Sequence, residues 1–222
     1  MTSSEGEESR FGGESLSAKL PILQRWGLSE GDFTEIVDGN PSLRGLALGY
    51  VAEWKFHKLF LDHAEISEIR KDDDHDRKRK GDRTFQYKGK EFIVEVKSLQ
   101  TNLIERRESS WFGKSQVDAS DSRTVKFDNG TTLKTTCLLR GQFDLLAVNC
   151  FAFENKWCFV FAKNTDLPQN TFKKYTEYQR AALLPTLIPV TWPPQPPFTT
   201  DPFSLLDELL REREGSFSTG KA

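Results

Sequence analysis

The chain is poor in the residues that staple small secreted proteins or hold zinc. Its 222 residues include three cysteines and three histidines. None of them lies in a Cys-x-x-Cys or Cys/His pair at zinc spacing, which excludes a disulfide scaffold and a zinc-ligand motif as the basis of the fold. The cysteines, which fall in β-prone runs, are expected to be small, buried, reduced side chains: Cys137, Cys150 and Cys158.

Long apolar runs and phosphate-binding loops are also missing. No stretch approaches the ~20 apolar residues of a membrane-spanning helix. The first fourteen residues are polar and acidic and do not resemble a secretory signal. There is no GxxxxGK[ST] motif. We therefore expect a cytoplasmic protein that binds neither a membrane nor a nucleotide cofactor.

Charge is abundant and unevenly distributed. The whole chain carries 31 basic and 33 acidic residues, a net charge of −2. Residues 40–189 alone carry 25 basic and 20 acidic residues, a net charge of +5, because both ends are acidic. Such a basic centre suits a polyanionic partner such as nucleic acid, although many domains with no such partner carry a similar excess.

The composition predicts one α/β domain with an appendage at each end. The segments are a disordered tail, a folded domain, and a Pro-rich connector with an amphipathic helix, over residues 1–18, 19–190 and 191–222.

Helical spacing of apolar residues predicts four helices in the chain. They cover about residues 29–39, 42–63, 175–184 and 203–214. Ser29 and Asp201 are the expected N-caps, and Gly215 is the expected end of the last helix. The helix over 42–63 is so rich in apolar residues that we expect it to be buried.

Period-two patterns predict the strands. One hairpin joins residues 84–87 to 92–98, and a second joins 124–127 to 131–138. The nearly continuous apolar runs over 143–153 and 157–162 are expected as central strands of a sheet covered on both faces. Residues 99–123 carry no clear pattern and could hold a helix.

The sharpest chemical feature lies on the first hairpin. Asp82 is followed after twelve residues by Glu95-Val96-Lys97. One carboxylate from each of two paired strands can converge on a hard cation such as Mg²⁺, which prefers oxygen ligands. Lys97 lies two residues beyond Glu95 and so on the same strand face. Its ammonium can orient a water or offset negative charge during phosphodiester hydrolysis.

At these residues the chain resembles the PD-(D/E)XK nuclease superfamily, which includes type II restriction endonucleases. In this resemblance Asp82 takes the first acidic position, Glu95 the second and Lys97 the lysine, while Glu53 on the preceding helix takes an upstream acidic position. Gly81 departs from the family pattern, which has proline there.

The resemblance implies a fold and an activity. The fold would be a restriction-endonuclease-like core, a mixed β-sheet flanked by helices, here with a β-hairpin insertion and a C-terminal helix. The activity would be Mg²⁺-dependent cleavage of DNA that leaves 5′-phosphates, with Mn²⁺ as a possible substitute. Asp82, Glu95 and Glu53 would hold the metal, with the backbone carbonyl of Val96 as a further ligand.

Each of these residues also has a structural explanation. Glu53 shares a helical stripe with apolar side chains, so it needs either a metal or a basic partner such as Lys or Arg. Glu95 and Lys97 could instead form cross-strand ion pairs on a solvated sheet face. Asp144, at the start of a central strand, is interpreted as a structural ion-pair member.

Other polar residues are candidates for DNA contacts. Gln116, in Lys114-Ser115-Gln116, lies where many members of the superfamily carry a polar residue beside the scissile phosphate. The second hairpin carries basic side chains that either enter a DNA groove or face solvent: Arg123, Lys126 and Lys134. The acidic run 72–76 is expected as a solvated loop, and the basic run 77–80 as a candidate phosphate contact.

The functional prediction is a type II restriction-like endonuclease acting on double-stranded DNA. A homodimer is expected because cutting both strands needs two active sites, and the helix over 203–214 is the candidate contact, unless it docks on its own domain. The alternatives are a non-cleaving DNA-binding or interaction module on the same fold, and a structure-selective or RNA nuclease.

Overall fold

The computed structural model describes residues 20–71 and 81–218. The chain divides into two compact units, Met1–Ala47 and Leu48–Ala222. The predicted tail and the charged runs 72–76 and 77–80 lie outside the described residues. Within the described parts, no helix is both long and apolar enough to cross a membrane.

The first unit is helical. It contains α1 (Ile22–Arg25), α2 (Glu30–Gly39) and the start of α3 (Pro41–Phe56). The Ser29 hydroxyl accepts a hydrogen bond from the Asp32 N–H, and the Asp32 carboxylate accepts one from the Ser29 N–H. This capping box satisfies two backbone donors at the start of α2 and confirms the predicted helix start. Neither α1 nor α2 buries a residue.

Helix α3 carries the chain into the second unit and continues as a π-helical turn, η2 (His57–Leu61). The predicted long helix is confirmed, but the expectation that it is buried is wrong. Of the residues of α3, Ala52 and Phe56 are buried, whereas Leu46 and Trp54 are 60% and 54% exposed. Its apolar residues extend beyond the single face that the sheet covers.

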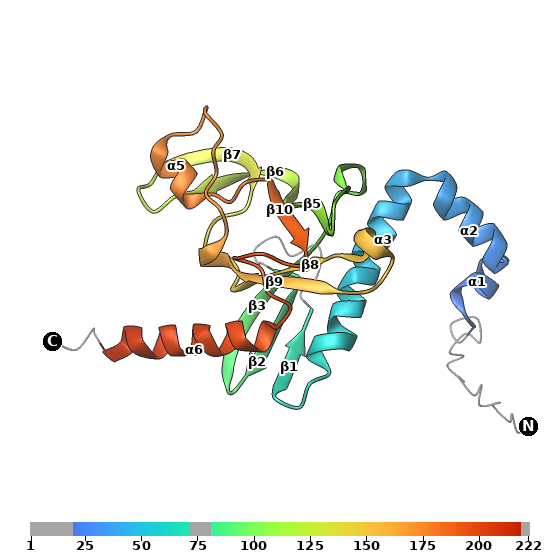
Figure 1. Ribbon diagram of the computed structural model, residues 1–222, viewed down its shortest axis with the longest axis horizontal. Helices are drawn as coiled ribbons and strands as arrows, with labels where there is room; N and C mark the ends of the chain where they lie inside the picture. The colour runs from blue at the N-terminus through green and yellow to red at the C-terminus, as the bar shows by residue number, and fades with distance from the viewer. Residues whose placement is uncertain (1–19, 72–80, 219–222) are drawn as a thin grey trace, which may run out of the picture. The chain divides into compact units, whose positions relative to one another are not determined.

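The second unit is built on a five-stranded sheet with the order β1-β2-β3-β8-β9 (Figure 1). Strands β3 and β8 are parallel, and the other neighbours are antiparallel. A mixed sheet flanked by helices is therefore confirmed. The strands span Ile66–Arg70, Arg83–Tyr87, Lys90–Ser98, Leu145–Asn149 and Phe159–Lys163.

Strand β3 shows how the two faces of the sheet are covered. Phe92, Val94 and Val96 point into a core cluster shared with η2 and helix α6. The alternate residues of the strand point to the opposite face, because side chains alternate along a strand. Ile93 packs there against a second core cluster. The face opposite α6 is thus the one that holds Glu95 and Lys97.

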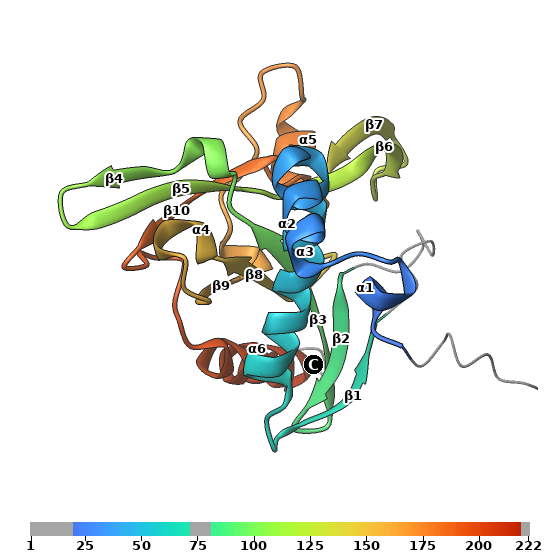
Figure 2. The same ribbon diagram turned by 90° about the vertical axis from the view of Figure 1, so that its right-hand side faces the viewer.

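Two smaller sheets complete the second unit. Strands β10, β5 and β4 form one, and β6 and β7 form the other (Figure 2). They span Leu187–Trp192, Ser110–Gln116, Glu105–Arg107, Asp118–Lys126 and Thr132–Cys137. The second predicted hairpin is confirmed as β6–β7. The possible helix over 99–123 is wrong beyond one short 3-10 turn, η3 (Thr101–Leu103), and strands β1, β4, β5 and β10 were not predicted.

Short helical segments fill the remaining connections of this unit. The expected central strand over 143–153 ends early, because α4 follows β8 directly. The helix predicted over 175–184 is present as α5, with Thr176 as its capping residue. The segments are α4 (Phe151–Glu154), the 3-10 turn η4 (Asn164–Asp166) and α5 (Glu177–Ala182).

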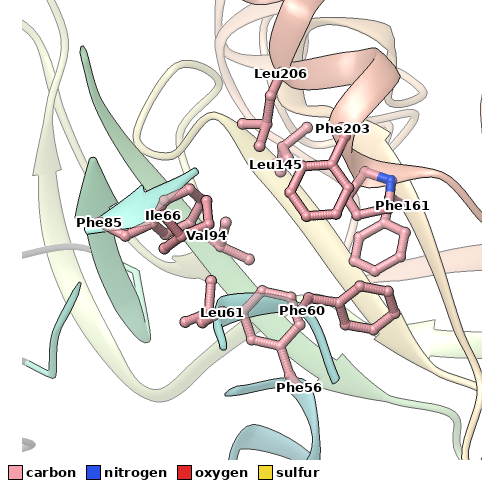
Figure 3. A pocket seen from close by; sticks show the side chains of 11 residues that line it. Phe56, Phe60, Leu61, Ile66, Phe85, Val94, Leu145, Phe161, Phe203 and Leu206 are labelled. Atoms are coloured by element: carbon pink, nitrogen blue, oxygen red, sulfur yellow. The ribbon is translucent and has the colours of Figure 1, made fainter. Parts of the chain in front are cut away.

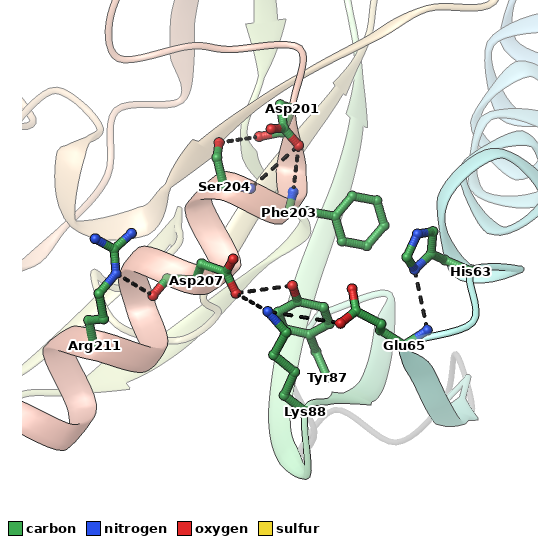
Figure 4. Close-up of polar contacts among 9 residues, drawn as sticks. All are labelled: His63, Glu65, Tyr87, Lys88, Asp201, Phe203, Ser204, Asp207 and Arg211. Atoms are coloured by element: carbon green, nitrogen blue, oxygen red, sulfur yellow. Dashed lines mark hydrogen bonds and ion pairs between the residues drawn. The ribbon is translucent and has the colours of Figure 1, made fainter.

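Helix α6 (Pro202–Ser218) lies against the central sheet of its own unit. Leu205, Leu206 and Leu209 are buried in the core cluster. Figure 4 shows the polar contacts along the same helix. Asp201 accepts hydrogen bonds from the first N–H groups, as predicted, and Asp207 accepts one from the Tyr87 hydroxyl at 3.0 Å.

Two expectations for this helix are therefore corrected. It does not end at Gly215 but runs to Ser218, because a glycine lowers helix propensity without forcing a stop. Its leucines, offered as a dimer contact, are packed on the chain's own sheet, which was the other possibility considered.

An apolar pocket beneath α6 is part of this core. Figure 3 shows phenylalanine and leucine side chains from η2, the sheet and α6 converging on it. Its volume is about 10 Å³, room for about one water, and it offers almost no polar surface. A water needs two or more polar partners, so the pocket is a packing imperfection and not a ligand site.

Candidate active site

Backbone pairing brings Asp82 and Glu95 to the same point of the hairpin. Arg83 pairs with Val94 in the β2–β3 ladder, so Asp82, one residue earlier, lies opposite Glu95. The Asp82 N–H donates to the Val94 carbonyl at 2.9 Å. Its carboxylate oxygen Oδ2 accepts a hydrogen bond from the Val96 N–H at 2.7 Å. These two bonds fix the carboxylate of Asp82 beside the strand that carries Glu95.

Gly81 explains why this chain lacks a proline before the aspartate. Its φ is +82°, a left-handed conformation that glycine adopts readily and proline, fixed near −65°, cannot. A Cβ at this position would also lie 2.3 Å from Ile93 Cγ2 and 3.1 Å from the Val94 carbonyl oxygen. The tight approach of Gly81 to β3 therefore requires glycine and delivers Asp82 to the ladder.

Lys97 completes a compact trio with the two carboxylates. Its Nζ lies 2.7 Å from Oε1 of Glu95, and the two side chains are 23% and 10% exposed. Burial acts to lower the pKa of Lys97, but the charges of Glu95 and Asp82 outweigh it, so its pKa is raised. Lys97 is therefore held as an ammonium. The pairing lies within one strand, not across strands on a solvated face.

The carboxylate of Asp82 is in an unfavourable environment. Burial, and then the negative charge of Glu95, raise its pKa to about 6, against a smaller opposing effect of Lys97 and the Val96 N–H. The trio holds two carboxylates and a single ammonium, so one negative charge is not balanced within it. An additional cation at this point would relieve the repulsion.

Glu53 approaches the trio from α3. Its Oε2 lies 3.1 Å from Nη1 of Arg83 and 3.1 Å from Nζ of Lys71. Burial, and then the charge of Asp82, raise its pKa despite these two cations. The sequence left open a metal or a basic partner for Glu53, and the structure supplies two basic partners while placing the carboxylate within electrostatic reach of Asp82.

Asp118 is a site residue that sequence reasoning missed. Its charge contributes to the raised pKa of Lys97, and its Oδ1 accepts a hydrogen bond from Nε2 of Gln116 at 2.9 Å. Gln116 in turn accepts a hydrogen bond from Gln100. The predicted Gln116 thus lies at the edge of the trio through Asp118. No local sequence pattern predicts Asp118 as a site residue, because its position depends on how β6 follows β5.

The remaining candidates take other places. Arg123 donates to Oε1 of Gln142 at 3.1 Å, and Lys126 is an exposed residue of β6. Lys114 lies on β5, paired with Pro189 of β10. The described contacts do not connect Arg123, Lys126 or Lys114 to the trio. Asp144 bonds the Ile93 N–H and Arg213, which confirms its structural interpretation.

The donor set of the site suits a hard cation. No group of three or more His, Cys, Asp or Glu side chains within residues 20–71 and 81–218 is arranged to hold a metal ion. The trio offers two carboxylates, and Val96 adds a carbonyl on the same side as its N–H, facing the start of β2. Mg²⁺ commonly takes one or two carboxylates and keeps several waters. These oxygen donors fit such an ion.

Comparison with known proteins gives little further information. No protein-family model matches the chain, and no curated protein matches it. A solved structure of a bacterial homing endonuclease, I-Ssp6803I, is similar at 16% sequence identity and a TM-score of 0.31, covering 64% of this chain and 87% of that one. At that TM-score the function has to be argued from the residues of this chain.

Proposed function

We propose that the protein is a Mg²⁺-dependent endonuclease that hydrolyses phosphodiester bonds in double-stranded DNA and leaves 5′-phosphates. The observation that carries the proposal is the trio of Asp82, Glu95 and Lys97, in which two repelling carboxylates and one ammonium meet on adjacent strands. A site with this much electrostatic strain is a candidate for catalysis and not for stability.

In this proposal Asp82, Glu95 and the Val96 carbonyl would hold the metal. A bound Mg²⁺ would polarise the scissile phosphate and lower the pKa of a water. Lys97, kept protonated by its two acidic neighbours, would orient the attacking water and stabilise the negative charge that develops on the phosphate. Glu95, through its contact with Lys97, would hold that ammonium in place.

Glu53 and Arg83 would support the site from α3. Nη1 of Arg83 bonds Glu53 and also the backbone carbonyl of Asp82 at 2.8 Å. This bridge connects the helix to the residue that carries the first carboxylate. Glu53 would therefore position Asp82 in the metal-free protein, and it would assist the metal only if its contacts with Lys71 and Arg83 loosen.

DNA is the proposed substrate because the middle of the chain is basic. Gln116, at the edge of the trio, and Lys114 on the same strand are proposed to contact the backbone near the cut. Arg123 and Lys126 are proposed to contact DNA further along β6. A restriction-like role, with two copies cutting the two strands, is the form of the function we propose.

The test is cleavage of supercoiled plasmid with Mg²⁺, with Mn²⁺ and with a chelator. We expect nicked or linear products with either metal and none with the chelator. Lys97→Ala and Glu95→Ala should each lower the rate at least 100-fold while leaving DNA binding within a few-fold. Rates and gel-shift affinities measured on the same preparations separate the two effects.

The chain contains a matched control. Glu154-Asn155-Lys156 repeats the Glu-x-Lys spacing on exposed residues at the end of α4. Glu154→Ala and Lys156→Ala should therefore leave cleavage unchanged. DNA binding without metal-dependent cleavage by the wild-type chain would favour a non-cleaving module, and a preference for RNA or branched substrates would favour the other alternative.

A further inference from the structure

Two of the three cysteines lie opposite each other across β8 and β9. Asn149 pairs with Phe159 at the end of this ladder. The next residues outward, Cys150 and Cys158, are therefore opposed, and the Cys150 N–H donates to the Cys158 carbonyl at 2.9 Å. Opposed strand residues joined in this way have Cα atoms about 5.5 Å apart, well within the range of roughly 4.4–6.8 Å that a disulfide spans. The backbone therefore holds the two cysteines at disulfide spacing.

The two side chains point to the same face of the sheet but differ in their access to solvent. Cys150 is 0% exposed in the core cluster opposite α6. Cys158 packs against that cluster and is partly exposed. The two thiols hydrogen-bond each other, which raises the pKa of Cys150 and lowers the pKa of Cys158. Cys158 is thus the sulfur that a reagent in solution can reach, with Cys150 directly behind it.

The third cysteine provides a contrast within the same chain. Cys137 is buried in a different core cluster, together with Val125 and Leu183. Its sulfur accepts a hydrogen bond from Nδ2 of Asn170 at 3.5 Å and lies 3.9 Å from the Tyr175 hydroxyl. These contacts are with an amide and a phenol. The cysteines of this chain therefore divide into one facing pair and one residue of an apolar core.

The segment between the paired cysteines already has its ends close together. Residues 151–157 join Cys150 to Cys158 and contain α4. At the two ends of this segment the rings of Phe151 and Trp157 stack, with 4.6 Å between their centroids. Bringing two reacting groups together is a large part of the free-energy barrier to their reaction, and here the fold has done so in advance. A cross-link between the two sulfurs would need no rearrangement of the sheet.

We propose that Cys150 and Cys158 are a redox-active pair that hydrogen peroxide oxidises to a disulfide. The Cys158 thiolate attacks one peroxide oxygen and becomes a sulfenic acid, while the O–O bond breaks and the other oxygen leaves as hydroxide, which takes up the proton lost by Cys158. The Cys150 sulfur then attacks the Cys158 sulfur, the S–O bond breaks, and the second oxygen leaves as water with the Cys150 proton. The two thiols lose two electrons and two hydrogens, and the peroxide is reduced to two waters. This chemistry needs no nuclease activity and goes beyond the proposed function.

Counting thiols by mass spectrometry tests the proposal on the full chain. The reduced protein is freed of reductant, treated with a small excess of hydrogen peroxide, denatured and alkylated. We expect the untreated chain to take up an alkyl group on each of its three cysteines and the oxidised chain on one. The intact mass before alkylation should fall by two hydrogens, a peptide map should join Cys150 to Cys158, and a dithiol reductant should reverse both changes. These two thiols should disappear about 10-fold faster than the thiol of Cys137, or more.

Serine variants assign the role of each sulfur. Cys137→Ser should form the cross-link at the wild-type rate. Cys150→Ser should stop at the sulfenic acid of Cys158, which a cyclic 1,3-dione traps, whereas Cys158→Ser should leave the buried Cys150 reduced. Oxidation of the two variants at equal rates would overturn the assignment of Cys158 as the attacking sulfur.

The wild-type chain decides the proposal even if a variant fails to fold. Alkylation of all three cysteines after peroxide treatment would overturn it. A cross-link that includes Cys137, or one that joins two chains, would also overturn it, because neither follows from the pairing of β8 with β9.

Discussion

Helices α3 and α6 are both amphipathic, yet the apolar residues of α6 are buried whereas most of those of α3 are exposed. Helix α6 buries Leu205, Leu206 and Leu209 against the central sheet. Helix α3 buries Ala52 and Phe56 at its end and leaves Leu46 and Trp54 exposed. Sequence spacing alone placed α3 in the core and left α6 open between a dimer contact and docking on its own domain.

The difference extends to their polar contacts. Asp207 of α6 pairs with Lys88 at 2.8 Å on an exposed edge, where burial costs little. Glu53 of α3 is 15% exposed beside Asp82, and burial with like charge raises its pKa. Helix α6 therefore stabilises the fold, whereas α3 places a carboxylate where it costs stability, beside the proposed site.

The largest test of this contrast compares one leucine from each helix. Leu206→Ala should lower the free energy of unfolding by about 2–5 kcal/mol, because the side chain is 2% exposed and its removal enlarges an apolar cavity. Leu46→Ala should change it by less than about 0.5 kcal/mol, because this side chain is 60% exposed. Urea denaturation of both variants at low concentration gives the two values.

The exposed fractions of the two side chains decide the expected outcome, since Leu46 is 60% exposed and Leu206 is 2% exposed. Equal losses from the two leucines would show that α3 is as buried as α6 and would remove the contrast.

The two helices also show what the sequence can predict. The leucine spacing of α6 and the cap at Asp201 identify the helix and its apolar face from local residues alone. Whether that face is covered depends on Tyr87, Phe92 and Phe161 of distant strands, and no local pattern contains this information. Strands β1 and β10, which lie in two different sheets, were missed for the same reason, since β10 contains Pro189 and pairs with distant β5.

The candidate site likewise combines residues that a local pattern predicts with residues that only the tertiary fold brings in. Asp82, Glu95 and Lys97 lie on one hairpin with a two-residue turn, so a period-two pattern was enough to bring them together. Asp118 arrives from β6, and no local signal marked it. The spacing could not supply the basic partners of Glu53 either, since Lys71 is eighteen residues along the chain and joins through the tertiary fold.

The second test concerns the negative charge of Asp82, which lies near Glu53 of α3 and Glu95 of β3. Asp82→Asn should raise the free energy of unfolding by about 1–3 kcal/mol at pH 7 in the presence of a chelator, because a carboxyl with a folded-state pKa of about 6 is held ionised at a cost. Asparagine keeps an oxygen that can accept from the Val96 N–H. The same variant should abolish plasmid cleavage.

The pH dependence gives the sign of that effect. Above pH 6 the folded chain carries the strained carboxylate, and between about 6 and 4 it binds the proton that the unfolded chain does not yet bind. The contribution of Asp82 to stability therefore improves as pH falls through this range, and the advantage of Asp82→Asn should vanish by about pH 4. An advantage that persists at pH 4 would assign it to packing and not to charge.

The smallest test concerns the polar contact that holds α6 to the sheet. Tyr87 is 1% exposed and donates its hydroxyl hydrogen to Asp207, which also pairs with Lys88. Tyr87→Phe removes that bond but leaves the ring in the core and the carboxylate with its other partner, so the loss should be about 0.5–1.5 kcal/mol. In an Asp207→Ala background, Tyr87→Phe should lower the free energy of unfolding by much less, because the acceptor of the hydrogen bond is already gone. An equal loss of stability from Tyr87→Phe in both backgrounds would mean that the hydroxyl acts through core packing. The polar contact between Tyr87 and Asp207 of α6 would then contribute nothing to the contrast with α3.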